Sequence, residues 1–124
     1  MDTSSKCLLT TAMVSSLSLA AHGAAVSLPT PPTQFLPVAE GHIAYDDTGG
    51  HSPLVLAIPG MGDLRSEYRA LRPLLQQAGY RVVTMDIRGH GETTVRWHDY
   101  CAHAVGRDAL ALIEHLNAGP AVIL

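Results

Sequence analysis

The apolar positions of this chain follow two kinds of pattern, and one of them predicts strands. Continuous apolar runs of four to eight residues are typical of strands in a sheet that is covered on both faces. Two segments that flank Glu40 and Gly41 also predict strands, because Ile43 and Tyr45 fall on one face. The predicted strands are residues 35–40, 42–47, 54–59, 80–87 and a run that starts at 121.

The other pattern repeats apolar residues at steps of three and four, which predicts helices with one apolar face. The first stripe is Leu64, Tyr68, Leu71, Leu75 and Ala78, and the second is Cys101, Val105, Ala109, Leu112 and Leu116. Gly79 and Asn117 are expected to end these helices, while Pro73 either kinks the first or stands near its regular start. Strands and helices that alternate in this way predict an α/β fold with a parallel sheet.

The N-terminal third lacks this alternation and predicts a leader and a linker. In residues 1–25, Lys6 precedes an uncharged, weakly apolar stretch that ends in small residues, which is typical of a secretory signal peptide. The alternative is a disordered start. Residues 26–36 are rich in proline and predict a linker, which leaves residues 37–124 for the folded domain. We expect a secreted or periplasmic protein, or a cytoplasmic one if the leader is not cleaved.

Composition excludes several classes of partner. The 124 residues carry a formal net charge of −3, and seven of the eight basic residues are scattered arginines. No basic patch for nucleic acid or an anionic membrane surface is therefore expected, and no apolar segment is long enough to span a bilayer. The two cysteines do not make a disulfide framework: Cys7 lies in the leader, and we expect Cys101 to be a buried free thiol.

The loop after the 54–59 strand is the first candidate for chemistry. The strand is joined to the helix by the residues Pro59, Gly60, Met61 and Gly62. A glycine-containing turn of this kind can bring backbone N–H groups close to a negative charge. That charge is either the pyrophosphate of a dinucleotide or the oxyanion of an acyl-transfer reaction. A dinucleotide loop needs a third glycine where this chain has Arg65, so it is the less favoured alternative.

Residues 86–93 decide between these alternatives. The segment Asp86-Ile87-Arg88-Gly89-His90-Gly91-Glu92-Thr93 resembles the Asp-x-Arg-Gly-x-Gly-x-Ser turn of the α/β-hydrolase family, with Thr93 in place of Ser. The Pro59-Gly60 loop is similar to that family's oxyanion loop, where His-Gly is usual. The resemblance runs from about Gly41 to Leu124. It implies antiparallel N-terminal strands followed by βαβαβ, in an incomplete three-layer α/β/α sheet.

The same resemblance implies roles for individual residues. The backbone N–H of Met61 becomes one donor of the oxyanion hole, within a loop formed by Pro59, Gly60 and Gly62, and the Met61 side chain lines the pocket. Asp86, Arg88, Gly89 and Gly91 become a structural turn motif rather than catalytic residues. His90 lies near the expected site, but we expect a solvated loop histidine.

The chain is not expected to hold a metal or cofactor. His98, Cys101 and His103 do not follow the usual spacing of a zinc site, and on a helix they would not converge. The family resemblance implies no cofactor, and nothing in the sequence predicts a defined protein partner. A small molecule is the expected substrate of the full-length protein.

No nucleophile is expected within these residues. The family's reaction needs a Gly-x-Ser-x-Gly elbow after a strand, then an acid and a His. Ser52 follows a glycine but precedes a strand, so we reject it. The elbow, carrying Ser, Asp or Cys, is expected beyond residue 124. The chain then reads as an inactive N-terminal fragment of a hydrolase acting on a small ester, amide or related bond; a non-catalytic truncated product is the alternative.

Export is directly testable. N-terminal sequencing of the protein made in its native host should give a mature chain that starts near Ala24 or Val26, because the small residues at 21–25 suit cleavage. An intact Met1 in the cytoplasmic fraction would contradict the assignment of residues 1–25.

Overall fold

The computed structural model describes residues 28–124, so the predicted signal peptide and Cys7 lie outside the described residues. The strands are β1 (Gln34–Val38), β2 (Gly41–Asp47), β3 (Leu54–Ala57), β4 (Arg81–Met85) and β5 (Ala121–Ile123). The helices are the 3₁₀ helix η1 (Arg65–Arg69), α1 (Leu71–Gln77) and α2 (Ala102–Leu116). All five predicted strands and both predicted helical segments are present.

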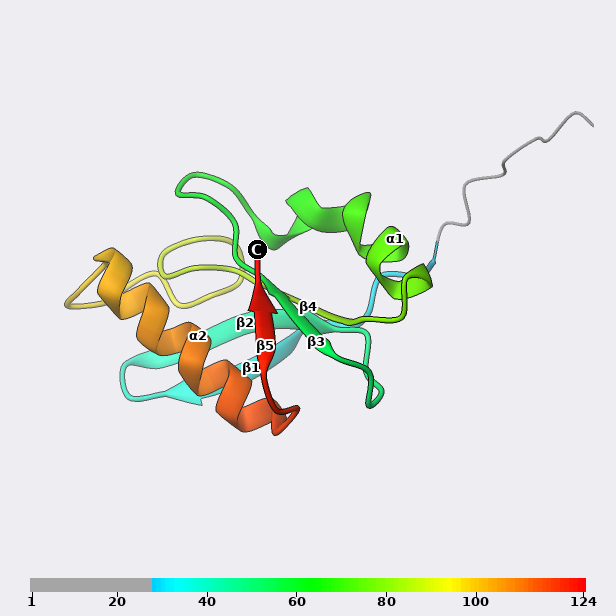
Figure 1. Cartoon of the computed structure of the whole chain (residues 1–124). Helices are drawn as coiled ribbons and strands as arrows, with labels where there is room; N and C mark the ends of the chain where they lie inside the picture. The colour runs from blue at the N-terminus through cyan, green and yellow to red at the C-terminus, as the bar shows by residue number, and fades with distance from the viewer. Residues whose placement is uncertain (1–27) are drawn as a thin grey trace, which may run out of the picture.

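The five strands form one mixed sheet in the order β1-β2-β4-β3-β5 (Figure 1). β1 pairs with β2 and β2 with β4 in antiparallel fashion, whereas β3 is parallel to both β4 and β5. The predicted architecture, antiparallel N-terminal strands followed by βαβαβ, is confirmed. In this sheet the carboxyl ends of β3 and β4 lie side by side, which brings the loops that follow them together.

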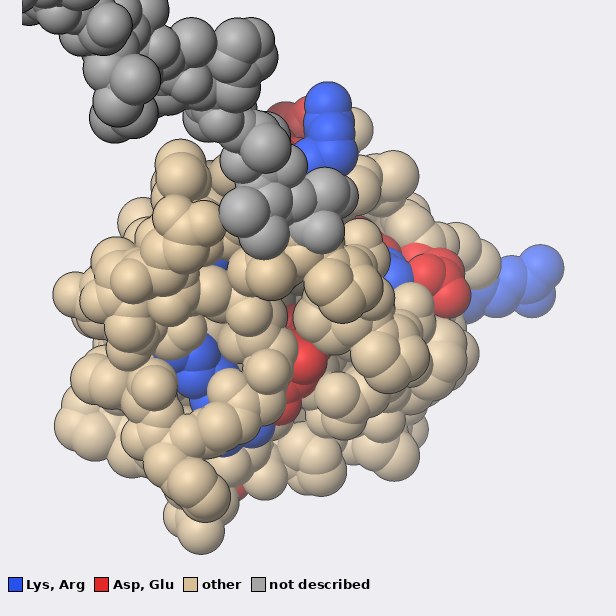
Figure 2. Space-filling model, turned by 90° about the vertical axis from the view of Figure 1, so that its right-hand side faces the viewer, with Lys and Arg blue, Asp and Glu red and all other residues tan. Residues whose placement is uncertain are grey.

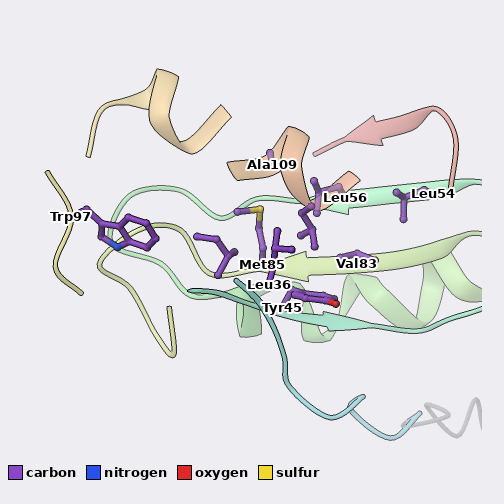
Figure 3. Packing of buried hydrophobic residues seen from close by; sticks show 10 residues of the cluster. Leu36, Tyr45, Leu54, Leu56, Val83, Met85, Trp97 and Ala109 are labelled. Carbon is purple, nitrogen blue, oxygen red and sulfur yellow. The ribbon is translucent and has the colours of Figure 1, made fainter. Parts of the chain in front are cut away.

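The main hydrophobic core lies between the sheet and α2. Strand side chains alternate between the two faces of a sheet, so every second residue of β2, β3 and β4 contributes to this core. Figure 3 shows Ala109 of α2 on the side of the sheet that carries Leu56 and Met85. The buried cluster consists of Leu36, Ile43, Tyr45, Leu54, Leu56, Val83, Met85, Trp97, Ala109 and Leu112.

Helix α2 ends as the sequence predicts but begins one residue later than its stripe. Asn117 adopts the left-handed conformation (φ 45°) and closes the helix. Cys101 is the N-cap residue with extended backbone, and it is exposed, so the prediction of a buried thiol is wrong. An N-cap residue lies outside the helical repeat, which explains the error.

None of the helices in residues 28–124 has the length and apolarity needed to cross a membrane.

The first predicted helix is divided in two. A 3₁₀ helix, η1, precedes α1, and Pro73 lies in the first turn of α1, where its missing N–H costs no hydrogen bond. Because a 3₁₀ helix has about three residues per turn, the predicted stripe does not stay on one face. Leu64 and Leu71 are exposed, and the buried residue of α1 is Arg72. Gly79 (φ 92°) follows the helix, as predicted.

The boundary between linker and domain also shifts. β1 begins at Gln34, so the last three residues of the predicted 26–36 linker belong to the sheet. Thr30 and Thr33, farther back in the linker, accept hydrogen bonds from Arg72 (3.3 Å) and Arg65 (2.7 Å). The described part of this segment therefore contacts the domain.

Two leucines of α2 test the position of the core. Leu112 is fully buried, whereas Leu110 on the same helix is 62% exposed. Leu112→Ala should lower the free energy of unfolding in urea by about 2–5 kcal/mol, because it leaves a cavity. Leu110→Ala, the matched control, should change it by less than about 0.5 kcal/mol. Equal losses in the two variants would mean that α2 packs with another face against the sheet.

Candidate active site

The candidate site lies at the carboxyl ends of β3 and β4. The loop of residues 58–64 follows β3, and the loop of residues 86–101 follows β4. In open α/β sheets this edge is where ligands bind. The predicted oxyanion loop and the predicted turn motif therefore lie at the same edge of the sheet.

The loop after β3 is a tight turn. The Asp63 N–H donates to the Gly60 carbonyl (3.0 Å), and Gly62 has φ 98°. A four-residue turn with a positive φ at its third residue is a type II turn, which requires glycine at that position. Met61 is the second residue of the turn and is 83% exposed. Within residues 28–124 its N–H has no hydrogen-bond partner.

A cavity of about 280 Å³ lies beside this turn. Its lining consists of Pro59, Met61, Ile87, Arg88, His90, Tyr100, Ala102 and Val105. Both loops and the start of α2 contribute residues to it. Met61 lines this cavity, as the sequence analysis expects of its side chain.

His90 connects the two loops of the candidate site. It is half-buried, and its ring bridges the two loops: Nε2 lies 3.0 Å from the Gly62 nitrogen, and Nδ1 lies 2.9 Å from the Arg88 carbonyl oxygen. The expectation of a solvated loop histidine is wrong. The partner of its Nε2 is 28 residues away in the sequence, and no local pattern signals such a contact.

Asp86 joins β4, the 3₁₀ helix η1 and the following turn. Its carboxylate is buried and accepts hydrogen bonds from the backbone of Arg65 (2.8 Å) and Glu92 (3.1 Å), and it pairs with the Arg65 guanidinium. A dinucleotide site would need this carboxylate for ribose hydroxyls. Its oxygens are already occupied, and Arg65 fills the space beside it.

Arg65 forms ion pairs with three acidic residues, of which Asp86 is one. Its guanidinium also bonds to Asp46 (3.0 Å) and Glu92 (2.5 Å). The hydrogen bonds from Arg65 and from Thr33 lower the pKa of the Glu92 carboxyl below its ordinary value. Acidic and basic atoms lie next to one another in a hollow on the face shown in Figure 2, and charges of one sign do not gather there.

Arg88 fixes the second loop to α2. Its guanidinium makes two hydrogen bonds to Asp108 (2.6 and 2.9 Å), donates a third to the Asp99 carbonyl, and lies 4.3 Å from the centre of the Trp97 ring. The hydrogen bonds to Asp108 raise the pKa of Arg88. Asp86 and Arg88 thus make their contacts within the protein, and their expected role as structural turn residues stays a prediction.

Thr93 stands where the resembling motif usually has serine, and its hydroxyl links the turn to β2. It is buried; its Oγ1 accepts a hydrogen bond from the Ala44 N–H (2.8 Å) and donates one to the Asp86 carbonyl (2.8 Å). A hydroxyl makes both contacts in either residue type. A serine at this position would also supply the hydroxyl that links the turn to β2.

The described residues bring one hydroxyl and one imidazole together. Thr94 Oγ1 lies 3.2 Å from His42 Nδ1, and it also accepts the His42 backbone N–H (3.0 Å). His42 Nε2 is bonded to the Glu92 carbonyl, so the pair ties the second loop to β2. Ser52, the rejected nucleophile, is exposed at the amino end of β3, away from this edge of the sheet.

His98 and Cys101, two of the three residues considered for a metal site, contact different partners. His98 pairs with Glu40 (2.8 Å), while the Cys101 thiol lies against Asp99 (3.3 Å). Among residues 28–124, no group of three or more His, Cys, Asp and Glu side chains could hold a metal ion.

Gly91 offers a test of the packing around Asp86. A Cβ atom at Gly91 would lie 2.1 Å from Asp86 Oδ2, whereas one at Gly106 in α2 would meet nothing within 4 Å. Gly91→Ala should therefore lower the free energy of unfolding by about 1–3 kcal/mol, because the buried carboxylate must move.

Gly106→Ala is the matched control. It should raise the stability by about 0.5–1 kcal/mol, because alanine favours a helix interior. Chemical denaturation measures both, and a Gly91→Ala variant as stable as the unsubstituted protein would contradict the tight contact with Asp86.

Comparisons with known proteins agree with this geometry. A family model described as alpha/beta hydrolase fold matches residues 53–124. A Mycobacterium tuberculosis protein assigned as the non-heme bromoperoxidase BpoC is 34% identical over 83 residues, which cover 67% of this chain and 31% of that protein.

Solved structures of similar fold include two that are more than 25% identical to this chain over the aligned residues. Bromoperoxidase from Bacillus anthracis is 28% identical with a TM-score of 0.68, covering 74% of this chain and 34% of that one. Epoxide hydrolase VrEH1 from Vigna radiata is 26% identical with a TM-score of 0.67, covering 74% and 29%. The chain thus spans about a third of the length of these relatives. It belongs to the α/β-hydrolase fold family.

Proposed function

We propose that this chain is the N-terminal part of a hydrolase that acts on a small ester, amide or related bond. The observation that carries the proposal is the N–H of Met61, which has no hydrogen-bond partner in the described part of the chain and lies in a type II turn beside the cavity at the carboxyl edge of the sheet. The catalytic triad of nucleophile, acid and His is proposed to lie beyond residue 124.

The proposed role of Met61 follows from charge. When a nucleophile attacks an ester or amide carbonyl, negative charge develops on the carbonyl oxygen. A backbone N–H that is already fixed in place stabilises that charge without reorganisation. In this fold the N–H of the residue after the nucleophile supplies the second donor. Residues 1–124 would then contribute one of the two oxyanion-hole donors and none of the reacting groups.

The cavity lining indicates the substrate group that binds there. Pro59, Met61, Ile87 and Val105 are apolar, and the one full positive charge, on Arg88, is neutralised by Asp108. A small uncharged group fits this environment better than a carboxylate or phosphate, which would face no free cation. No cofactor is needed for such a reaction.

The relatives do not identify the nucleophile. Bromoperoxidases and epoxide hydrolases are both among the similar proteins, and one fold hosts many chemistries. Reading the coding region beyond codon 124 decides the point. A Gly-x-Ser-x-Gly or Gly-x-Asp-x-Gly within a few residues of β5 supports the proposal, whereas a stop codon supports the non-catalytic alternative. Export to the periplasm or medium remains part of the proposal.

Met61→Pro tests the proposed donor. Proline has no N–H, yet it suits the second position of a type II turn, so the variant removes the donor and keeps the turn. In the complete gene product, kcat on a small ester or epoxide should fall about 100- to 1000-fold.

Met61→Ala is the control, because it removes the side chain and retains the N–H. Its kcat should stay well above that of the Pro variant, because the donor is kept, whereas its KM should rise, because the side chain lines the cavity. Equal kcat values for the Pro and Ala variants would exclude Met61 as an oxyanion donor.

A further inference from the structure

The imidazole of His90 is the one side chain that hydrogen-bonds to the turn carrying the proposed donor, among the residues described. It reaches the Gly62 N–H from the loop after β4, while its other nitrogen faces the Arg88 carbonyl. The two contacts are 3.0 and 2.9 Å long, so both are of ordinary hydrogen-bond length.

These partners fix the state of the ring. A carbonyl oxygen only accepts hydrogen bonds, so Nδ1 must carry a proton and donate it to Arg88. The Gly62 N–H only donates, so Nε2 must be unprotonated and accept. His90 is therefore a neutral imidazole in one tautomer, and it offers the turn a lone pair.

That lone pair selects one orientation of a peptide group. Type I and type II turns differ by a flip of the central peptide, which here joins Met61 to Gly62. The positive φ of Gly62 belongs to type II. In the flipped form the Met61 carbonyl oxygen would take the place of the Gly62 N–H and face the Nε2 lone pair, a repulsive contact.

His90 is itself held rigidly enough to do this. Its N–H donates to the Ile87 carbonyl (3.0 Å) and its carbonyl accepts from Thr93 (3.1 Å), so its backbone is fixed on both sides. The Arg88 carbonyl that orients the ring belongs to the residue clamped by Asp108. A chain of contacts through His90, Arg88 and Asp108 thus links the turn to α2.

We propose that His90 is a positioning residue of the oxyanion loop: its Nε2 accepts the Gly62 N–H, which keeps the turn in its type II form and ties it to the loop after β4, and so fixes the place of the preceding Gly60–Met61 peptide, whose N–H is the proposed donor. This proposal rests on the proposed function for the role of Met61. The hydrogen bond and tautomer do not depend on that function, so the two can fail separately.

The ring state is measured first, in the complete gene product. Long-range ¹H–¹⁵N correlation spectra in mildly alkaline buffer should show Nδ1 protonated and Nε2 unprotonated for His90. The Gly62 amide proton should shift upfield in His90→Leu, which removes the acceptor, but not in His51→Leu, which replaces an exposed histidine of the loop before β3. An Nε2-protonated ring, or an unchanged Gly62 shift, would overturn the proposal whatever the enzyme's activity.

Kinetics then separate positioning from folding. His90→Leu should lower kcat on the order of 10- to 100-fold with KM nearly unchanged, because a misplaced donor weakens transition-state binding. His90→Gln, whose side-chain oxygen can accept from Gly62, should restore most of the rate, and His51→Leu should match the unsubstituted enzyme. If His90→Leu keeps full kcat, or if Gln rescues nothing while it folds normally, the positioning role is wrong. If the unsubstituted protein hydrolyses nothing, the proposed function fails, and the ring measurement still tests the hydrogen bond.

Discussion

The arrangement of the site depends on one buried carboxylate. Asp86 stands where β4 ends and is almost fully buried, so its charge must be compensated within the protein. Arg65 supplies the opposite charge, and the backbone N–H groups of Arg65 and Glu92 supply hydrogen bonds. Because these donors belong to the segments after β3 and after β4, satisfying Asp86 brings the two loops together.

A second ion pair extends this constraint to the helix. Arg88 binds Asp108 of α2, stacks on Trp97 and orients His90 through its carbonyl. Asp86 thus fixes the loops to each other, and Arg88 fixes them to the layer that covers the sheet. Buried ion pairs do not by themselves make a protein more stable, but breaking one leaves an uncompensated charge. A loop held in this way presents the Met61 N–H with little freedom to reorganise, which is what a preorganised donor requires.

Local patterns predicted the elements well and the tertiary contacts poorly. The apolar runs of β3 and β4, and the stops at Gly79 and Asn117, follow from residue type and spacing alone. The stripe through Leu64 and Leu71 failed because a 3₁₀ segment changes the period and because Arg72 takes the inward position. In the site, the turn glycines Gly62 and Gly91 could be read from the motifs. The partners of Arg65 and His90 could not, since each is set by folding across about 20 or more residues.

Amide hydrogen exchange in Asp86→Asn tests the central claim most directly, because asparagine keeps the size of the side chain and removes its charge. We expect exchange to accelerate at Arg65 and Glu92, whose N–H groups bind the carboxylate, and also at Gly62, which binds His90 in the neighbouring loop. Amides in the centre of α2, remote from this carboxylate, should exchange as before. Unchanged protection at all three loop amides would contradict the claim that Asp86 holds the two loops of the site together.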